Sequence, residues 1–152
     1  MGLEYLSNRT EELICLAQQA RGDLNHNFLG TEHVVAGLAN MAPRYGPLKN
    51  LFEKRKITYK EVVKRITEIE GKGIETVLDE IIAIEPKLET LVEESYNLQN
   101  EGPLKPEYLL YGIIASEIDT IGKKVLQGFG LTVKETKPQS AVIQEFRRIV
   151  GI

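Results

Sequence analysis

The sequence predicts an all-α domain built from two copies of one helical unit. The apolar positions of one predicted helix return 75 residues later, with Leu13, Leu16, Ala17 and Ala20 corresponding to Leu88, Leu91, Val92 and Ser95. On the same offset, residues 29–38 (LGTEHVVAGL) correspond to residues 104–113 (LKPEYLLYGI). Apolar residues recur every three or four positions, and no segment alternates with the period of two that marks a strand. Two copies of one unit in so short a chain predict a single pseudo-symmetric domain.

The first copy contains four predicted helices. Their starts are marked by the capping-box pattern of residues 8–11, by Thr31, by the loop that contains Pro43 and Gly46-Pro47, and by the capping box of residues 58–61. Their expected apolar faces consist of Leu13, Leu16, Ala17 and Ala20; of Val34, Val35 and Leu38; of Leu48, Leu51 and Phe52; and of Val62, Val63, Ile66 and Ile69. The repeat register predicts buried side chains at Leu16, Leu38, Leu91 and Ile113.

The second copy repeats these signals. Pro86 and Pro106 each suit the first turn of a helix, where a missing N–H costs little. Residues 132–135 form a capping box that matches residues 58–61. The predicted domain spans residues 1–136, with repeats at about 3–70 and 86–136. Apolar residues in the connector, about 71–85, predict that it packs on the repeats as a short helix, and the tail, 137–152, is either an extra helix or the start of a linker.

Composition excludes several classes of function. The 152 residues have the length of one domain, and a net charge of −3 argues against a nucleic-acid binder. The single cysteine, Cys15, excludes an internal disulfide and is expected to be buried as a small hydrophobe. No signal peptide or membrane-length apolar stretch is present, so a cytoplasmic location without membrane contact is expected. Residues 44–65 carry eight basic and two acidic residues, and residues 68–101 carry ten acidic and two basic ones. This asymmetry indicates either solvated helix faces or an acidic half that receives basic peptides.

The chain resembles the double repeat at the N-terminus of Clp-family ATP-dependent unfoldases, of the ClpC type, and the first copy carries the matching residues. The matching residues are Arg9, Leu16–Gln18, His26–Asn27, Gly30–His33 and Gly37–Leu38. The resemblance covers about residues 3–136 and includes the duplication. The second copy departs from the pattern, because Lys105, Pro106 and Tyr108 stand where Gly, Thr and His are expected.

The resemblance implies two pseudo-twofold-related four-helix repeats that form one compact domain. It also implies a non-catalytic domain that binds substrate proteins and adaptors for an ATP-driven motor feeding a peptidase. The sequence contains no G-x-x-x-x-G-K-[ST] phosphate loop. Two possibilities stay open: the N-domain of a Clp unfoldase, or a stand-alone regulator that sequesters marked proteins or a cyclic peptide without a motor. No nucleophile–base pair appears, so neither enzymatic activity nor a cofactor is expected.

The sharpest candidate site is Gly30-Thr31-Glu32-His33. It lies at a predicted helix start, where free backbone N–H groups and the helix dipole favour an anion, and the Thr31 hydroxyl adds a donor. The Glu32 carboxylate suits a guanidinium. The resemblance implies that the ligand is phosphoarginine, a degradation mark. The structural alternative is that Thr31 caps the helix and Glu32 is an ordinary first-turn acid.

The second copy offers only a degenerate site at Lys105 and Glu107. Pro106 replaces the residue that bears the hydroxyl and lacks an N–H donor, so binding there is expected to be weak or lost. No metal site is expected, because His26 and His33 with Glu32 lack H-E-x-x-H spacing. His33 is expected to be a packed or capping histidine.

Overall fold

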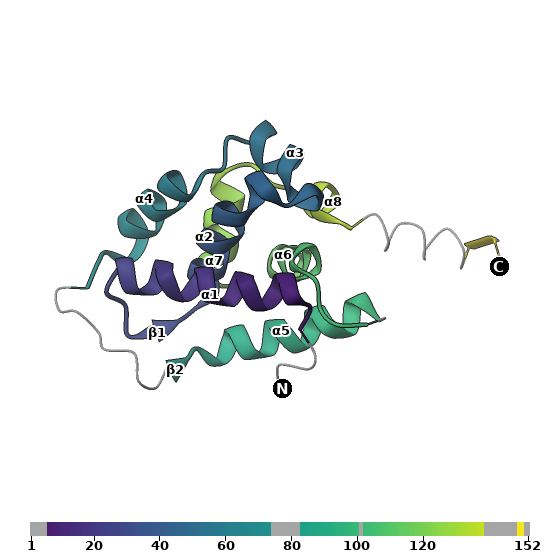
Figure 1. Cartoon of the computed structure of the whole chain (residues 1–152), viewed down its shortest axis with the longest axis horizontal. Helices are drawn as coiled ribbons and strands as arrows, with labels where there is room; N and C mark the ends of the chain where they lie inside the picture. Colours follow the sequence, from purple (N-terminus) through teal and green to yellow (C-terminus); the bar gives the residue numbers. More distant parts are fainter. Residues whose placement is uncertain (1–5, 74–82, 101, 139–148, 151–152) are drawn as a thin grey trace.

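The computed structural model describes residues 6–73, 83–100, 102–138 and 149–150. Within these residues the chain forms eight α-helices and one pair of two-residue strands (Figure 1). The all-α prediction is therefore confirmed. None of the described helices is long and apolar enough to cross a membrane.

Each repeat contributes four helices in the predicted order. The first repeat consists of α1 (Asn8–Asp23), α2 (Thr31–Met41), α3 (Gly46–Lys54) and α4 (Tyr59–Glu70), with a 3-10 turn η2 (Ala42–Arg44) after α2. The second consists of α5 (Pro86–Gln99), α6 (Pro106–Ala115), α7 (Ile121–Gly128) and α8 (Val133–Thr136). The strands β1 (Phe28–Leu29) and β2 (Ala83–Ile84) precede α2 and α5. The fourth helix is thus much shorter in the second repeat.

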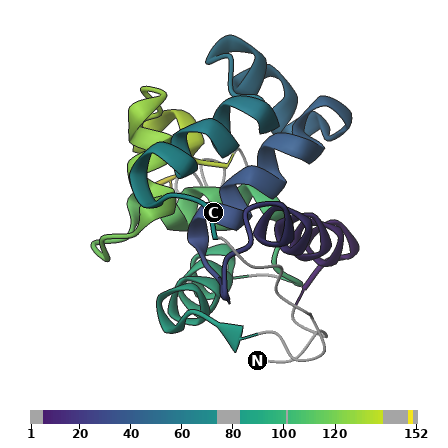
Figure 2. The same cartoon turned by 90° about the vertical axis from the view of Figure 1, so that its left-hand side faces the viewer.

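The second helix of each repeat forms the core. Every residue from Thr31 to Ala39 in α2 is buried, and α2 packs against α1, α4 and α7 (Figures 1 and 2). Helix α6 packs against α5, α7 and α8. Burial of their apolar side chains supplies the main favourable term in folding.

Paired glycines let the first two helices of each repeat approach closely. A Cβ atom at Gly37 would lie 3.0 Å from both the backbone nitrogen of Ala17 and the Cδ1 atom of Leu13. A Cβ atom at Gly112, on the same offset, would collide with the Ser95 hydroxyl. The repeated Gly-apolar pair of the sequence therefore marks two equivalent helix crossings.

Backbone pairing links the two repeats reciprocally. Leu29 at the end of β1 accepts a hydrogen bond from the N–H of Glu85, with N···O 2.9 Å. Leu104, at the equivalent position before α6, accepts from the N–H of Ser7 before α1, with N···O 3.0 Å. Strands β1 and β2 pair in parallel, and Leu6 forms an isolated parallel bridge with Leu104. The expectation that no sheet exists was wrong at this small scale, because two-residue strands are too short to show alternation.

The start and face of α1 differ from the prediction. Ser7, rather than Asn8, caps α1 by accepting a hydrogen bond from the N–H of Thr10. Cys15 is exposed rather than buried. Leu16 is only partly buried, whereas its counterpart Leu91 is fully buried. The buried face of α1 consists of Thr10, Leu13, Ala17, Ala20 and Arg21. Packing against α2 therefore rotates α1 so that Cys15 and Leu16 lie beside the buried stripe.

The other expectations about the core and the caps have mixed outcomes. Leu38, Leu91 and Ile113 are fully buried as expected. The Thr58 and Thr132 caps are confirmed, because each side chain accepts a hydrogen bond from the backbone three residues later. Ile69, expected on the apolar face of α4, is 44% exposed. The predicted helix in the connector (residues 74–82) and most of the predicted tail helix (139–148) lie outside the described residues.

Candidate functional site

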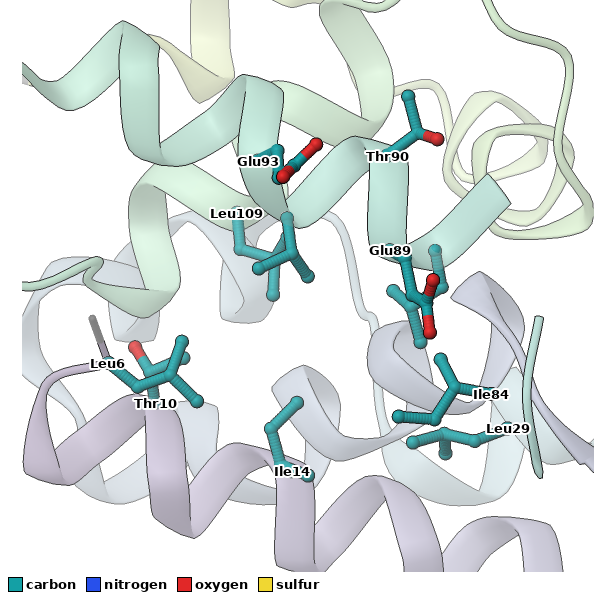
Figure 3. A pocket seen from close by; sticks show the side chains of 11 residues that line it. Leu6, Thr10, Ile14, Leu29, Ile84, Glu89, Thr90, Glu93 and Leu109 are labelled. Atoms are coloured by element: carbon teal, nitrogen blue, oxygen red, sulfur yellow. The ribbon is translucent and has the colours of Figure 1, made fainter. Parts of the chain in front are cut away.

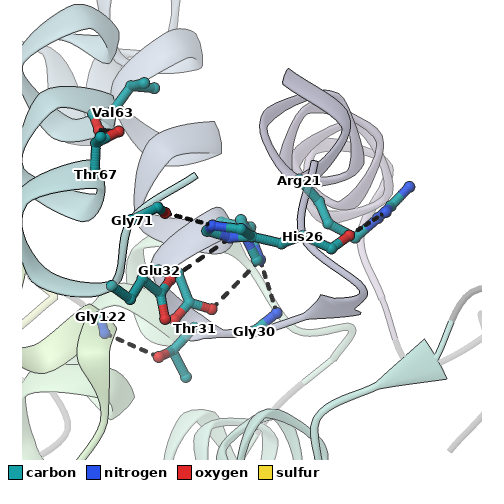
Figure 4. A network of polar contacts seen from close by, with 11 residues as sticks. Arg21, His26, Gly30, Thr31, Glu32, Val63, Thr67, Gly71 and Gly122 are labelled. Atoms are coloured by element: carbon teal, nitrogen blue, oxygen red, sulfur yellow. Dashed lines mark hydrogen bonds and ion pairs between the residues drawn. The ribbon is translucent and has the colours of Figure 1, made fainter. Parts of the chain in front are cut away.

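The predicted site lies at a pocket that Glu85, the residue before α5, lines together with three segments of the first repeat. These are the loop between α1 and β1, the N-terminus of α2, and the C-terminus of α4 with the residues that follow it (Figure 4). The pocket has a volume of about 360 Å³. Its lining residues are Asn25, His26, Asn27, Phe28, Glu32, His33, Glu70, Lys72, Gly73 and Glu85. The lining thus contains three carboxyl groups and one lysine.

The backbone after α4 brings this end of the helix to the loop. Gly71 has a φ of 77°, a left-handed conformation that favours glycine, and it ends α4. Gly73 then donates its N–H to the carbonyl oxygen of Leu24, with N···O 2.8 Å. A Cβ atom at Gly73 would overlap the carbonyl oxygen of Asn25. The segment 71–73 is therefore fixed against the loop that follows α1.

Thr31 is buried and already has a partner inside the protein. Thr31 is 1% exposed. Its Oγ1 accepts a hydrogen bond from the backbone N–H of Gly122, with N···O 3.0 Å. Thr31 is the first residue of α2, and Gly30 is the N-cap. That Thr31 donates a hydrogen bond to a ligand stays a prediction. In the structure, its hydroxyl oxygen links α2 to α7.

His33 caps the helix from its third position. Its Nδ1 accepts a hydrogen bond from the N–H of Gly30, with N···N 2.9 Å. This is the part of a capping box usually taken by Glu or Gln. Burial, followed by the proximity of His26 and Arg21, lowers the pKa of His33 to about 3. The expectation of a packed, capping histidine is confirmed.

The two histidines form a hydrogen-bonded chain whose direction is determined by its ends. Because Gly30 donates to Nδ1 of His33, the neutral His33 ring carries its proton on Nε2. That Nε2–H donates to Nδ1 of His26 at 2.8 Å. His26 then donates from Nε2 to the carbonyl oxygen of Gly71, also at 2.8 Å. The chain connects the start of α2 to the end of α4.

Glu32 is a buried carboxyl group beside two other acids. It is 4% exposed, and its Oε1 lies 3.3 Å from Nδ1 of His33. A Cβ atom at Gly30 would collide with Oε1 of Glu32 and lie 2.6 Å from Oε2 of Glu85. Burial, followed by repulsion from Glu70 and Glu85, raises the pKa of Glu32 to about 8. A cation that entered here would therefore offset both the burial of the ionised Glu32 carboxylate and its repulsion by the neighbouring acids.

The equivalent region of the second repeat has a different construction. Lys105 is exposed and precedes Pro106, the first residue of α6. Glu107 is partly buried and accepts a hydrogen bond from the Tyr45 hydroxyl at 2.7 Å. The Arg9 guanidinium lies 5.9 Å from the centroid of the Tyr45 ring. The structure thus provides Glu107 with a tyrosine partner from the first repeat in place of a histidine chain.

A second cavity is an apolar groove between α1 and α5, the first helices of the two repeats (Figure 3). It has a volume of about 490 Å³. Its lining residues are Leu6, Thr10, Ile14, Leu29, Ile84, Leu88, Glu89, Thr90, Val92, Glu93 and Leu109. Apolar side chains therefore form most of the lining, and Glu89 and Glu93 contribute the charge.

Sequence reasoning missed Glu70, Glu85 and the groove. Glu70 lies at the end of α4, and its Oε1 is 3.6 Å from Nδ1 of His26. Residues 26 and 70 are too far apart in the sequence for a short motif to pair them. The groove had one signal in the sequence, the recurrence of apolar side chains on the first helix of each copy. Helical periodicity alone does not say which of these side chains remain accessible.

Known proteins of similar sequence are subunits of Clp proteases and related ATPases. No family model matches the chain. A probable ATP-binding subunit of an ATP-dependent Clp protease from Chlamydia pneumoniae is 27% identical over 143 residues, which are 90% of this chain and 16% of that protein. The negative regulator of genetic competence ClpC/MecB from Bacillus subtilis is 23% identical over 136 residues, 88% of this chain and 16% of that protein. The chain therefore spans about one sixth of the length of these relatives.

Solved structures share the whole fold. The N-terminal domain of the chaperone ClpD from Arabidopsis thaliana matches with a TM-score of 0.67 at 16% identity, covering 94% of this chain and 99% of that one. A chain from a malarial protein secretion system matches with a TM-score of 0.66 at 17% identity, covering 95% and 96%. In sequence this chain is thus similar to part of Clp ATPase subunits, and in fold it is similar to the N-terminal domain of ClpD.

Proposed function

We propose that this chain binds substrate and adaptor proteins for a Clp-type ATPase, without catalytic activity of its own. The observation that carries the proposal is the groove between α1 and α5. Its volume, about 490 Å³, lies in the range of ligand-binding pockets. An accessible apolar concavity of this kind suits the side chains of an unfolded or exposed segment.

Charge at the groove indicates the composition of the bound segment. Glu89 and Glu93 both line it, and neither acid has an ion-pair partner among the described residues. Complementary charge mainly favours specificity and the rate of encounter. We therefore propose a ligand with an apolar centre and basic flanks, in agreement with the acidic character of residues 68–101.

A matched pair of substitutions on α5 tests this proposal. Val92 lines the groove, whereas Leu98 is 49% exposed and does not. The probe is a fluorescein-labelled peptide with an apolar centre and terminal lysines, followed by fluorescence anisotropy. We expect Val92→Glu to weaken binding at least about tenfold and Leu98→Glu to change it less than about twofold. Equal effects of the two variants would reject the groove as the binding surface.

A second variant keeps the test valid if Val92→Glu fails to fold. Glu93 is exposed, so Glu93→Lys should preserve the fold while it reverses the charge of that side chain and leaves the groove with one acid, Glu89, and one base. The substitution should weaken binding of the lysine-flanked peptide and strengthen binding of a peptide with glutamates at both ends. Unchanged affinity for both peptides would contradict the proposed charge preference.

The finer part of the proposal is recognition of phosphoarginine at the first-repeat pocket, by Gly30, Thr31, Glu32 and His33. The support is the cluster of carboxyl groups of Glu32, Glu70 and Glu85, which suits a guanidinium. The phosphate has fewer donors available, because the Gly30 N–H already donates to His33 and the Thr31 side chain is buried. In the second repeat, Lys105 and Glu107 are expected to bind more weakly, since Pro106 removes a donor.

Backbone amide shifts distinguish the two repeats. Titration with free phosphoarginine should shift residues 29–35 and leave residues 104–110 unchanged, and Glu32→Gln should abolish the shifts. Arginine and inorganic phosphate, titrated separately, are the controls. Equal shifts in both regions would refute the asymmetry. No shifts at about 1 mM ligand would reject phosphoarginine and leave groove binding unaffected.

The alternative function is that of a stand-alone regulator that sequesters its ligands without a motor. The same groove would serve either role. Co-purification of the full-length native protein with or without a Clp peptidase separates the two, because only a motor-linked domain should enter such a complex in an ATP-dependent manner.

A further inference from the structure

We propose that a pocket beside α3 binds an acidic segment of a partner protein, with one apolar side chain of that segment inside the pocket. The end of α2, the 3-10 turn η2, α3 and the start of α4 line this cavity, which we call the α3 pocket. Its volume, about 430 Å³, lies in the range of ligand-binding pockets. It shares no lining residue with the groove or with the first-repeat pocket.

The interior of the α3 pocket is apolar. Phe52 and Ile57 line it and are buried, and the Ile57 N–H donates to the carbonyl oxygen of Phe52 with N···O 2.9 Å. Ala39 and Ala42 contribute small side chains from α2 and η2. Small and well-packed apolar walls of this kind suit a single leucine or phenylalanine side chain of a partner.

Two lysines of the lining have no acidic partner. Lys49 and Lys56 are exposed, and neither forms an ion pair with another residue that the structure describes. By contrast, the neighbouring Arg55 pairs with Glu135 at 2.6 Å. Glu53 is the one acid in the lining, so basic groups outnumber acidic ones there. The charge at the α3 pocket is therefore available to an acidic ligand.

The second repeat uses the equivalent positions differently. Lys123, 74 positions after Lys49, donates from Nζ to the carbonyl oxygen of Ser116 at 2.6 Å. Gly130 corresponds to Lys56 on the same offset, and both have a left-handed φ, of 80° and 55°. Glycine adopts this conformation at a lower cost than lysine does. The first repeat thus has a lysine where glycine would fit the backbone better, which indicates a role for that charge at the surface.

The basic surface continues from the α3 pocket along α4. Lys60 follows Tyr59, which lines the pocket, and Lys64 lies one helical turn further on. Both lysines are exposed, and neither has an ion-pair partner within the described parts of the chain. Like charges at this spacing repel each other, and an acidic segment along α4 would offset that repulsion. The apolar interior and the acid Glu53 favour a protein segment over a nucleic acid, whose backbone is uniformly negative.

The proposal adds a class of partner to the function proposed above and does not depend on the groove. The probe is a fluorescein-labelled helical peptide with one central phenylalanine and glutamates on either side of it, followed by fluorescence anisotropy. We expect saturable binding that weakens as the NaCl concentration rises, because salt screens exposed charges. Replacement of the peptide phenylalanine by serine should weaken binding at least about tenfold, because the apolar contact is lost.

Charge reversals on the third helix of each repeat provide a matched pair of variants. Lys49→Glu should weaken binding of the acidic peptide at least about fivefold. Lys124→Glu makes the same change at an exposed position of α7 and should change the affinity less than about twofold. Lys56→Gly keeps the test valid if Lys49→Glu fails to fold. It should weaken binding about twofold or more without lowering the melting temperature, because a φ of 55° favours glycine.

Three results would overturn the proposal. The first is the absence of binding at about 1 mM protein. The second is an equal effect of Lys49→Glu and Lys124→Glu. The third is a single-stranded oligonucleotide that binds as tightly as the peptide and is weakened by Lys49→Glu, which would assign this surface to nucleic acid.

Failure of groove binding would give a different pattern. Val92→Glu should leave the affinity for the acidic peptide unchanged, and Lys49→Glu should leave the affinity for the lysine-flanked peptide unchanged, because the two residues line separate cavities. Loss of acidic-peptide binding in the Val92→Glu protein would place that peptide in the groove and would reject the α3 pocket.

Discussion

The Thr31 side chain and the Gly122 backbone join the two repeats at the starts of their helices. The Gly122 N–H in the first turn of α7 donates to Oγ1 of Thr31, with N···O 3.0 Å, and both residues are buried. A Cβ atom at Gly122 would lie 2.8 Å from Cβ and Oγ1 of Thr31. A residue that resembled a ligand donor in sequence is therefore also part of the inter-repeat interface.

We expect Gly122→Ala to destabilise the domain by about 1–3 kcal/mol, because the added methyl group overpacks the contact with Thr31. The control is Gly46→Ala at the start of α3, where an added Cβ meets nothing within 4 Å. Chemical denaturation of both variants provides the free energies of unfolding. If Gly122→Ala lowered the free energy of unfolding no more than Gly46→Ala, α7 would be able to move away from α2 without cost.

Stability should decline on both sides of a plateau between about pH 4.5 and 6.5. The pKa of Glu32 is raised from 4.5 to about 8, so its contribution to stability is complete below pH 4.5 and is lost as the pH rises through 8. The pKa of His33 is lowered from 6.5 to about 3, so its contribution is complete above pH 6.5 and is lost as the pH falls toward 3. Between the two ordinary values the effects cancel.

Glu32→Gln isolates the alkaline side of this profile. Each side has a limiting slope of about 1.4 kcal/mol per pH unit for one proton. With EDTA present, the substitution should flatten the decline between pH 6.5 and 8, while Glu68→Gln should leave it unchanged. A decline that persists in the Glu32→Gln protein would assign it to another group.

Two leucines at equivalent repeat positions should differ in their energetic contribution. Leu91 is fully buried, so Leu91→Ala should cost about 2–5 kcal/mol. Leu16 is only partly buried, so Leu16→Ala should cost less than about half as much. Equal losses measured by urea denaturation would mean that α1 is rotated relative to the structure.

The crossing of α5 and α6 should show coupling between Gly112 and Ser95. Gly112→Ala places a methyl group against the Ser95 hydroxyl, which also donates to the Leu91 carbonyl oxygen at 2.6 Å. In a double-mutant cycle, Ser95→Gly should recover part of the loss caused by Gly112→Ala, by about 0.5–3 kcal/mol. Strict additivity of the two substitutions would indicate that the helices separate instead.

Local signals were sufficient for the helices and their order. The starts of α2, α5 and α6, and the caps at Thr58 and Thr132, follow from residue types within one turn. The repeated apolar stripe predicted the duplicated packing. These features depend on residues three or four apart, whose contacts helical geometry specifies without reference to the rest of the chain.

The position of the site within the sequence was also predicted, but its chemistry was only partly foreseen. Residues 30–33 do lie at a helix start beside a pocket. The acids Glu70 and Glu85, which complete that pocket, come from the ends of distant segments. Packing of α1 on α2 likewise decided that Cys15 would be exposed and Leu16 only partly buried.

The sequence by itself determined the all-α class, the two repeats and the location of the first-repeat site. Only the tertiary structure decided which side chains meet there. His26 reaches Gly71 across 45 positions, and Gly122 reaches Thr31 across 91. Contacts of that separation depend on how helices rotate and cross when the apolar core closes, and no periodic pattern in the chain encodes that rotation.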